Sequence, residues 1–246
     1  MCFVPLLSPS QKAIKAPVYS AIFLFRLYPA LLPIGRFYTN MFALKTRETQ
    51  KIQSCINLLP TDGEVYQYGK IFEDADATSL CTQLLETTFW QYDVLIIFGK
   101  KITTKREVAY YGDEPFLYKY SGITKSALPW TEAMLYVKRK VESISQETFN
   151  ACLLNLYHSG EEGMGWHSDD EAELQTGAAI ASVSFGAERR FDFKHKVNGT
   201  KVSTILPNGS MLIMKGGCQQ MWKHRLPPSK KILAARINLT FRKMQR

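Results

Sequence analysis

The feature that most restricts the fold is a series of short apolar runs that fills the chain from Phe149 onward. These runs are rich in Val, Ile and Phe, and glycine, proline or asparagine separates several of them, a pattern typical of strands. Because no long helical pattern interrupts the series, we predict a mainly β fold with flanking helices, a jelly roll of the double-stranded β-helix type. The predicted strands are 151–157, a strand around His167, 180–185, 190–195, 202–206, 210–214, 224–226 and 237–241.

Turn residues and helical spacing give local expectations. Residues 202–206 and 210–214 flank the turn Pro207-Asn208-Gly209 and are predicted to pair as a hairpin. Leucines at helical spacing predict a helix over residues 76–87, with Asp76 or Thr78 as its N-cap. A second helix is predicted to begin at Pro129, because proline fits the first helical turn. Further short strands are predicted at residues 94–100, 108–112 and 116–122.

The cysteines exclude two classes of small protein. The five cysteines form no CxxC pair and are odd in number, so neither a disulfide framework nor a cysteine zinc site is indicated. Their usage favours a reducing, intracellular compartment. At 246 residues the chain can hold one sizeable domain or two small ones.

Charge is spread unevenly along the chain. The net charge of +9 divides into +6 for residues 1–47, −9 for 48–185 and +12 for 186–246. The basic C-terminal part indicates an anionic partner such as nucleic acid, or simply a solvated basic surface. Charge alone leaves both interpretations open.

Residues 1–47 differ from the rest, since they carry no acidic residue. Their longest uninterrupted apolar run, 21–25, is far too short to span a bilayer, and we expect no membrane association. We interpret this extension as a poorly ordered tail or as a segment ahead of a functional start at Met41, in preference to a targeting peptide. Residues 48–246 then form the main domain. Nothing in the sequence indicates an oligomer, so we expect a monomer.

A His-x-Asp pair is the strongest candidate for a metal site. Side chains two apart on a strand point to the same face, so His167 and Asp169 would converge. They supply two members of a 2-His-1-carboxylate triad, which holds Fe(II) and leaves coordination positions open. We expect His224 to be the third, because His158 lies in a turn-like stretch and His195 in a basic, surface-like context.

A second polar pattern lies near the C-terminus. Over residues 236–242 (RINLTFR) polar and apolar side chains alternate, so four polar groups share one face of a strand. Two arginines facing inward would require an anionic ligand, for which the bidentate guanidinium is suited. A solvent-facing edge strand is the alternative. The polar residues are Arg236, Asn238, Thr240 and Arg242, and Asn155 with Tyr157 forms a similar pair on another strand.

Together these motifs resemble the AlkB family of Fe(II)- and 2-oxoglutarate-dependent dioxygenases, which repair alkylated nucleic acid. The resemblance covers about residues 90–244, involves several motifs in the right order, and is strongest to the DNA-repair branch. The matching segments are 155–157 (NLY), 166–171 (WHSDDE), 180–187 (IASVSFGA), His224 and 236–242.

The resemblance implies a cofactor and two co-substrates. Fe(II) would be bound by His167, Asp169 and His224, with 2-oxoglutarate and O2 as co-substrates. Arg236 would pair with one carboxylate of 2-oxoglutarate. Asn155 and Tyr157 would assist Arg236, whereas Arg242, Asn238 and Thr240 would hold the other end of the molecule.

The implied reaction is oxidative demethylation of bases of the 1-methyladenine and 3-methylcytosine type in DNA. It would release formaldehyde, succinate and CO2. An RNA-directed or single-strand-directed demethylase is the alternative within the same chemistry. The complete ligand set argues against a binding module without turnover, and a zinc hydrolase would not explain the two arginines.

The resemblance also implies that the damaged base is flipped out of the duplex. Phe98, followed by Gly99 and Lys100, would be the wedge that fills the gap, or else an ordinary core residue. Asp170 would accept a hydrogen bond from the exocyclic amine of the base, or would orient His167. Residues 90–125 would form the recognition lid, in which Tyr118, Lys119 and Tyr120 contact the base. Candidate phosphate contacts are Lys100, Lys101, Lys105, Arg106, Arg189, Arg190, Lys194 and Lys196.

Overall fold

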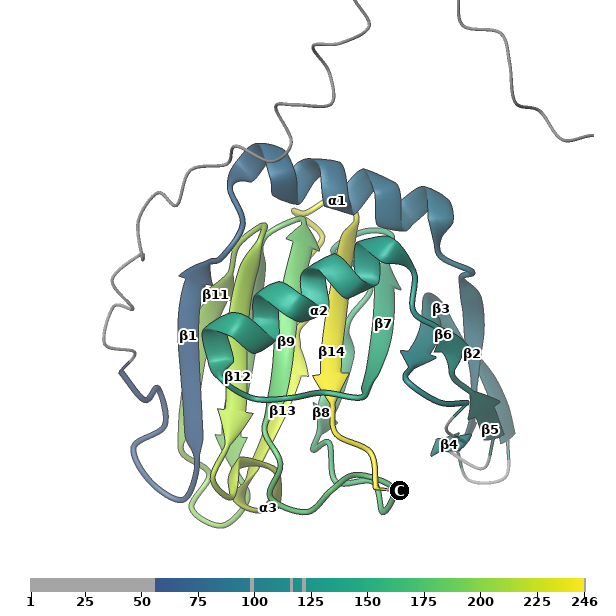
Figure 1. Ribbon diagram of the computed structural model, residues 1–246. Helices are drawn as coiled ribbons and strands as arrows, with labels where there is room; N and C mark the ends of the chain where they lie inside the picture. The colour runs from purple at the N-terminus through teal and green to yellow at the C-terminus, as the bar shows by residue number, and fades with distance from the viewer. Residues whose placement is uncertain (1–55, 98–99, 116, 121–122, 246) are drawn as a thin grey trace, which may run out of the picture. The chain divides into compact units, whose positions relative to one another are not determined.

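The structure is a computed structural model that describes residues 56–97, 100–115, 117–120 and 123–245 (Figure 1). All of these belong to the unit Gln50–Arg246. The expectations for residues 1–47 lie outside the described residues. Within the described part of the chain, no helix has the length and apolar character needed to cross a membrane.

A major sheet of eight strands forms the centre of the unit. Its pairs are antiparallel, except that β6 (Leu128–Pro129) runs parallel to β3. Strand β14 is central, because β9 and β7 pair along its two sides. The order across the sheet is β1 (Glu64–Lys70), β12 (Ser210–Lys215), β9 (Ile180–Gly186), β14 (Arg236–Arg242), β7 (Ala151–Tyr157), β3 (Lys100–Gly112) and β2 (Gln91–Ile97).

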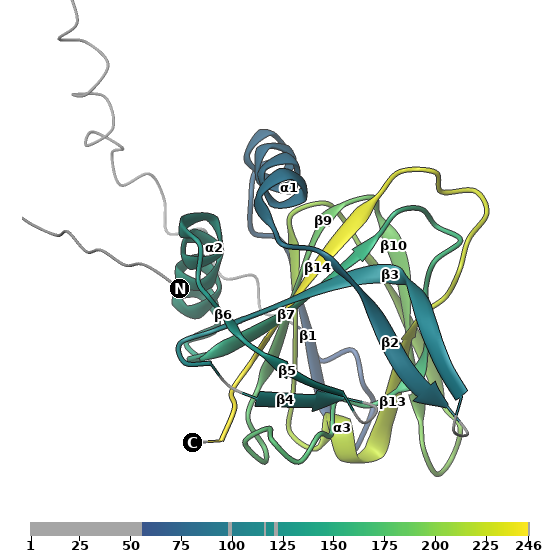
Figure 2. The same ribbon diagram turned by 90° about the vertical axis from the view of Figure 1, so that its right-hand side faces the viewer.

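A minor sheet of four strands faces the major sheet (Figure 2). The interior between them is filled by aromatic and aliphatic side chains of both sheets, with Phe193 and Trp222 from the minor sheet and Leu212 from the major one. This two-sheet arrangement confirms the predicted jelly roll. The minor sheet has the order β11 (Lys201–Leu206), β10 (Arg189–His195), β13 (Trp222–Leu226) and β8 (Met164–His167).

Three smaller pieces complete the described elements. A hairpin is formed by β4 (Leu117–Tyr120) and β5 (Ile123–Ser126). The short helix α3 (Cys218–Met221) leads directly into β13. Isolated bridges join Asn57 to Tyr66 and Leu174 to Met244.

Two helices, α1 (Asp74–Thr87) and α2 (Glu132–Ser145), cover one face of the major sheet (Figure 1). Their buried residues, such as Leu84 and Val137, belong to the same core cluster as Leu239 of β14. Because strand side chains alternate, the apolar half of β14 packs beneath these helices and its polar half faces the other sheet. Because α1 and α2 cover one face of the major sheet, the polar side chains of residues 236–242 face the interior between the two sheets.

The starts of both helices differ from the predictions. Helix α1 begins two residues earlier than predicted, after Glu73, and the Thr78 hydroxyl bonds back to the Asp74 carbonyl, so it does not cap the helix. Pro129 lies in β6, and α2 is capped by Thr131, whose hydroxyl accepts from the Met134 amide. A threonine side chain satisfies a free amide of the first turn, which proline cannot do.

The predicted hairpin between residues 202–206 and 210–214 is wrong. Strand β11 pairs with β10 in the minor sheet, whereas β12 pairs with β1 and β9 in the major sheet. The turn between them is held by other elements: Gly209 donates to the Ser184 carbonyl, and its own carbonyl accepts from the Ile71 amide. The chain therefore crosses from one sheet to the other at this turn.

Candidate active site

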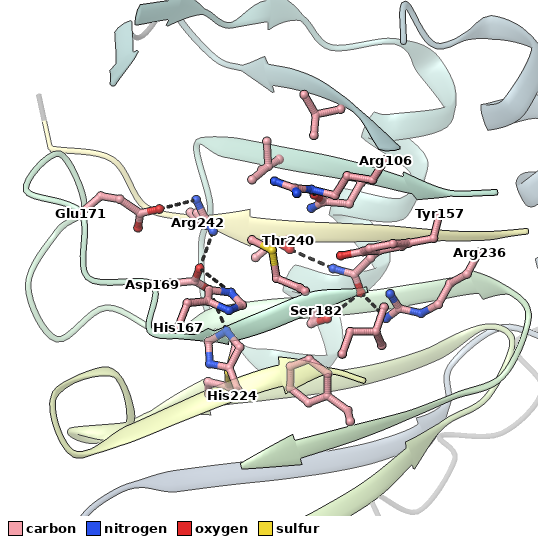
Figure 3. A pocket seen from close by; sticks show the side chains of 18 residues that line it. Arg106, Tyr157, His167, Asp169, Glu171, Ser182, His224, Arg236, Thr240 and Arg242 are labelled. Carbon is pink, nitrogen blue, oxygen red and sulfur yellow. Dashed lines mark hydrogen bonds and ion pairs between the residues drawn. The ribbon is translucent and has the colours of Figure 1, made fainter. Parts of the chain in front are cut away.

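The two sheets enclose a cavity lined by residues from eight strands (Figure 3). Polar groups gather at both ends of the cavity. One end holds two histidines and two carboxylates, and Arg236 and Tyr157 lie at the other (Figure 3).

The first end contains the predicted metal ligands. His167 on β8 and His224 on β13 are direct cross-strand partners in the minor sheet. The two Nε2 atoms approach the Asp169 carboxylate, at 3.9 Å from His167 and 3.8 Å from His224. One ligand atom from each residue lies within 4.8 Å of the others. The predicted convergence is confirmed, although its stated reason is not, because β8 ends at His167 and Asp169 lies in the loop beyond it.

The protonation of this cluster suits a divalent cation. The Nδ1 atom of His167 lies 2.8 Å from the Gly165 carbonyl, to which only an N–H can donate, so the neutral form of this ring carries its lone pair on Nε2. Burial lowers the pKa of His224 to about 3, which keeps its imidazole neutral. Burial raises the pKa of Asp169, but Arg242 and the two histidines outweigh it, so the carboxyl pKa lies below its usual value. Two imidazoles and one carboxylate are the donor set of a non-haem Fe(II) site.

Arg242 contacts the metal cluster directly. Its Nη2 donates to Oδ1 of Asp169 over 2.6 Å, and its Nη1 lies 3.5 Å from Oε1 of Glu171. The side chain is buried, so the ion pair is little weakened by solvent. In this structure Arg242 orients and ionises a metal-ligand candidate.

The far end of the cavity holds a cationic group with neutral partners. Nη2 of Arg236 donates to Ser184 Oγ over 2.8 Å and to Asn238 Oδ1 over 2.7 Å. Among the described residues its buried Nε has no hydrogen-bond partner. Burial lowers the pKa of Arg236 to about 10, with a further lowering from Arg189. A buried cation whose recorded acceptors are neutral fits a carboxylate ligand.

The polar row of β14 links the two ends. Asn238 Nδ2 donates to Thr240 Oγ1 over 2.9 Å, and Asn155 and Tyr157 line the cavity from neighbouring β7. The Arg236 guanidinium lies 5.6 Å from the centre of the Tyr157 ring. All six residues predicted to contact the co-substrate therefore line one cavity. The alternative of an exposed edge strand is wrong, because β14 is central and buried throughout.

Several residues that line the cavity had no predicted role in it. Arg106 was predicted as a phosphate contact but is buried, and its Nε donates to Asn155 Oδ1 over 3.0 Å. Its spacing of two from Val108, which faces the same cavity, is a signal that could have revealed this. Glu171, Ser182 and Phe191 also line the cavity and had no assigned role.

Two other basic residues are buried, contrary to the prediction that they lie at the surface. Arg189 was a predicted phosphate contact but is buried, and it donates to the backbone carbonyls of Gly160, Glu162 and Pro227. His195 was expected at the surface. It is also buried, with its Nδ1 accepting from the amides of residues 197 and 198 and its Nε2 lying 3.2 Å from Asp62.

The substrate-contact predictions fall mostly outside the described residues. Phe98 and Gly99 are not described, nor are the side chains of Lys100, Tyr118, Lys119 and Tyr120. The backbone of β2 ends at Ile97, which is paired with Lys100 at the start of β3. Asp170 does not line the cavity. Its side chain is 66% exposed and lies 4.0 Å from Lys196.

Two facing antiparallel sheets, a His-Asp-His cluster and a buried arginine in one cavity define a jelly-roll oxygenase that uses a metal and an anionic co-substrate. Comparison with known families agrees, because residues 64–242 match the 2OG-Fe(II) oxygenase superfamily. The chain belongs to this superfamily and, within it, to the AlkB family. It is a dioxygenase whose cofactor is Fe(II) and whose co-substrates are 2-oxoglutarate and O2.

The similar proteins include two kinds of AlkB homologue. DNA oxidative demethylase ALKBH2 of Bos taurus is 43% identical over 188 residues, which cover 72% of this chain and 68% of that protein. The Homo sapiens protein of the same name is 38% identical, covering 72% of each chain. Alpha-ketoglutarate-dependent dioxygenase alkB homolog 3 of Bos taurus is 37% identical, covering 68% of this chain and 61% of that protein.

A solved structure supports the fold alone. OsALKBH1 superposes with a TM-score of 0.52 at 17% identity, covering 75% of this chain and 99% of that one.

Proposed function

We propose that this chain is an oxidative demethylase that repairs N-alkylated bases of the 1-methyladenine and 3-methylcytosine type in DNA. The observation that carries the proposal is the presence, in one cavity, of the His167–Asp169–His224 cluster and of the buried Arg236 with neutral partners. Relatives that carry the name DNA oxidative demethylase support DNA as the substrate.

Each end of the cavity has a defined task in this proposal. His167, Asp169 and His224 hold Fe(II), and Arg242 keeps Asp169 ionised. Arg236 pairs with one carboxylate of 2-oxoglutarate. The side-chain amides of Asn155 and Asn238 line the cavity that would hold this molecule. When bound, Fe(II) with 2-oxoglutarate and O2 supplies the oxidant that hydroxylates the N-methyl group, yielding succinate, CO2 and, after loss of the hydroxymethyl group, formaldehyde.

The carboxylate that contacts the base is better assigned to Glu171 than to Asp170. Glu171 lines the cavity, and one of its oxygens lies 3.5 Å from Arg242. Asp170 is mostly exposed and lies outside the lining. A largely buried carboxylate, such as the 14% exposed Glu171, can accept a hydrogen bond from an exocyclic amine, whereas an exposed one is solvated. We expect Glu171→Gln to lower kcat/KM more than Asp170→Asn, and the reverse order would restore the original assignment.

The decisive assay measures formaldehyde and succinate released from a methylated oligonucleotide with Fe(II) and 2-oxoglutarate. The expected result is equal release of both from 1-methyladenine or 3-methylcytosine DNA, and loss of both in His167→Ala. Absence of turnover on methylated DNA would refute the proposed substrate. Turnover restricted to RNA or to single strands would support the alternative demethylase.

The same assay tests base flipping. Phe98→Ala should slow repair of duplex DNA and leave a single-stranded oligonucleotide unaffected, because only the duplex needs a side chain to fill the vacated stack. An unchanged duplex rate would remove Phe98 from the proposed mechanism. Tyr118→Ala is the matched test of the lid.

A further inference from the structure

The strand that carries His167 is weakly anchored. Strand β8 has four residues and is the last strand of the minor sheet in the described part of the chain. It pairs with β13 at only two positions, His167 with His224 and Met164 with Leu226. Two paired positions do not by themselves fix the direction of an edge strand's side chains. His167 nevertheless has to meet Asp169 and His224 within a few tenths of an ångström for metal binding.

The register between these pairs contains a β-bulge. Gly165 and Trp166 of β8 together lie opposite the single residue Arg225 of β13. Bulges next to active sites re-aim neighbouring side chains. Here the bulge presents the Gly165 carbonyl to Nδ1 of His167 at 2.8 Å, which selects the imidazole tautomer with a free Nε2.

Arg225 joins the bulge to the rest of the sheet. Its guanidinium lies 4.5 Å from the centre of the Trp166 ring, a cation–π stack. Its Nε and Nη2 both lie 2.9 Å from Oδ2 of Asp192 on β10. Asp192 and Arg225 are direct cross-strand partners. The Arg225 side chain therefore connects the inner strand β10 with Trp166 on the last strand, β8.

Asp192 is in turn held from the other side. Its Oδ1 accepts from Arg190 Nε over 2.6 Å and from Ser203 Oγ of β11 over 2.7 Å. The Asp192 side chain is only 3% exposed, although it points away from the cavity. The chain of contacts Ser203–Asp192–Arg225–Trp166 therefore crosses all four strands behind the two histidines.

We propose that Arg225, fixed by Asp192 and stacked on Trp166, is a positioning residue that sets the bulge and thereby the orientation and tautomer of His167. Arg225 touches no reacting group and acts through Trp166 and the Gly165 carbonyl. The inference rests on the proposed role of His167 as a metal ligand. A lysine in its place would keep the charge but would lose both the planar stack and the two-nitrogen contact with Asp192.

The test measures Mn(II) affinity of the metal-free chain by electron paramagnetic resonance of the free ion. Outer partners of metal ligands typically contribute ten- to a hundredfold to affinity, so we expect Arg225→Gln, Asp192→Asn and Trp166→Leu each to weaken Mn(II) binding by about tenfold. Trp166→Phe should retain most of the affinity, because it keeps an aromatic face. Lys223→Gln is the matched control: it makes the same charge change on the same strand at an exposed side chain.

A second readout separates positioning from general stability. The chain has four histidines, so nitrogen NMR can follow each ring. We expect the Nδ1–H tautomer of His167 in the parent chain and a mixture of tautomers in Arg225→Gln and in the milder Arg225→Lys. Wild-type Mn(II) affinity and an unchanged tautomer in Arg225→Gln would overturn the inference, as would an equal loss in Lys223→Gln. If His167→Ala binds Mn(II) as tightly as the parent, the proposed metal site itself fails.

Discussion

Arg242 donates a 2.6 Å hydrogen bond to the carboxylate of Asp169, and both side chains are buried between the sheets. The same carboxylate faces the Nε2 atoms of His167 and His224. Three cationic or potentially cationic groups thus surround one carboxylate, and this keeps it ionised although burial opposes its charge. A site arranged in this way is ready to receive a divalent cation without first losing a proton from Asp169.

Removing this arginine should therefore weaken both the fold and the metal site. Breaking a buried ion pair on one side typically costs about 3–5 kcal/mol, so we expect Arg242→Gln to lower the free energy of unfolding by about 3 kcal/mol. Mn(II) affinity at neutral pH should fall as well, because the Asp169 pKa rises. Urea unfolding and Mn(II) titration measure the two effects. Lys243→Gln, the same charge change at the next residue, should have little effect, and equal losses in both variants would contradict this role.

Arg236 should determine 2-oxoglutarate affinity. A hydrogen bond to a charged group contributes about 1.5–3 kcal/mol, so losing the bidentate contact in Arg236→Lys should raise the dissociation constant roughly ten- to a hundredfold. Calorimetric titration of the Mn(II)-loaded chain under nitrogen measures this without turnover. Arg139→Lys, at an exposed arginine of α2, serves as the control. Unchanged binding in Arg236→Lys would mean that the co-substrate lies elsewhere in the cavity.

Arg189 should prove to be a structural residue. Its guanidinium bonds to carbonyls of the loop after β7 and to the Pro227 carbonyl after β13, so it joins two loops. Arg189→Met would leave these buried acceptors unsatisfied, and we expect a loss of about 3 kcal/mol in unfolding free energy. Lys194→Met on the same strand is exposed and should change stability by less than about 0.5 kcal/mol. If Arg189→Met instead keeps its stability and loses DNA affinity, the phosphate-contact interpretation would return.

The metal-free chain should lose stability in mild acid. His224 has an ordinary pKa of 6.5 that burial lowers to about 3 in the folded chain. Between these values the unfolded chain binds a proton that the folded chain does not. The contribution of His224 to the free energy of unfolding is therefore complete above pH 6.5 and falls as pH decreases toward 3. The slope of the unfolding free energy against pH reaches about 1.4 kcal/mol per pH unit. The lowered pKa of Asp169 acts in the same direction at lower pH, because its ionised form is favoured in the folded chain.

Urea unfolding at pH 7.5, 6.5, 5.5 and 4.5 tests this expectation. His224→Phe should flatten the dependence, because it removes the buried imidazole. A slope that survives in His224→Phe would assign the acid sensitivity to another group. Saturating Mn(II) should steepen the dependence, since only the neutral imidazole binds the metal.

Strand periodicity was a secure guide for the polar residues of β14. Arg236, Asn238, Thr240 and Arg242 share one face because the backbone of a strand alternates its side chains, whatever packs around it. The place of His224 beside His167 and Asp169 was also predicted from the sequence, since only four histidines were available. Asp169 was placed correctly by an incorrect argument, because a loop, and not the strand, brings it to the histidines.

Local sequence patterns were therefore enough to identify the residue types of the candidate metal and co-substrate sites and to predict which of them share a strand face. Long-range packing was needed to place residues 210–214 in the major sheet, to bury Arg106 and Arg189, and to turn Glu171, not Asp170, toward the cavity. It also decided that Arg225 meets Trp166 across a bulge. The physical reason is that sheet order, register and burial depend on contacts between residues far apart in the chain, and a local pattern does not record which distant strand it will pair with.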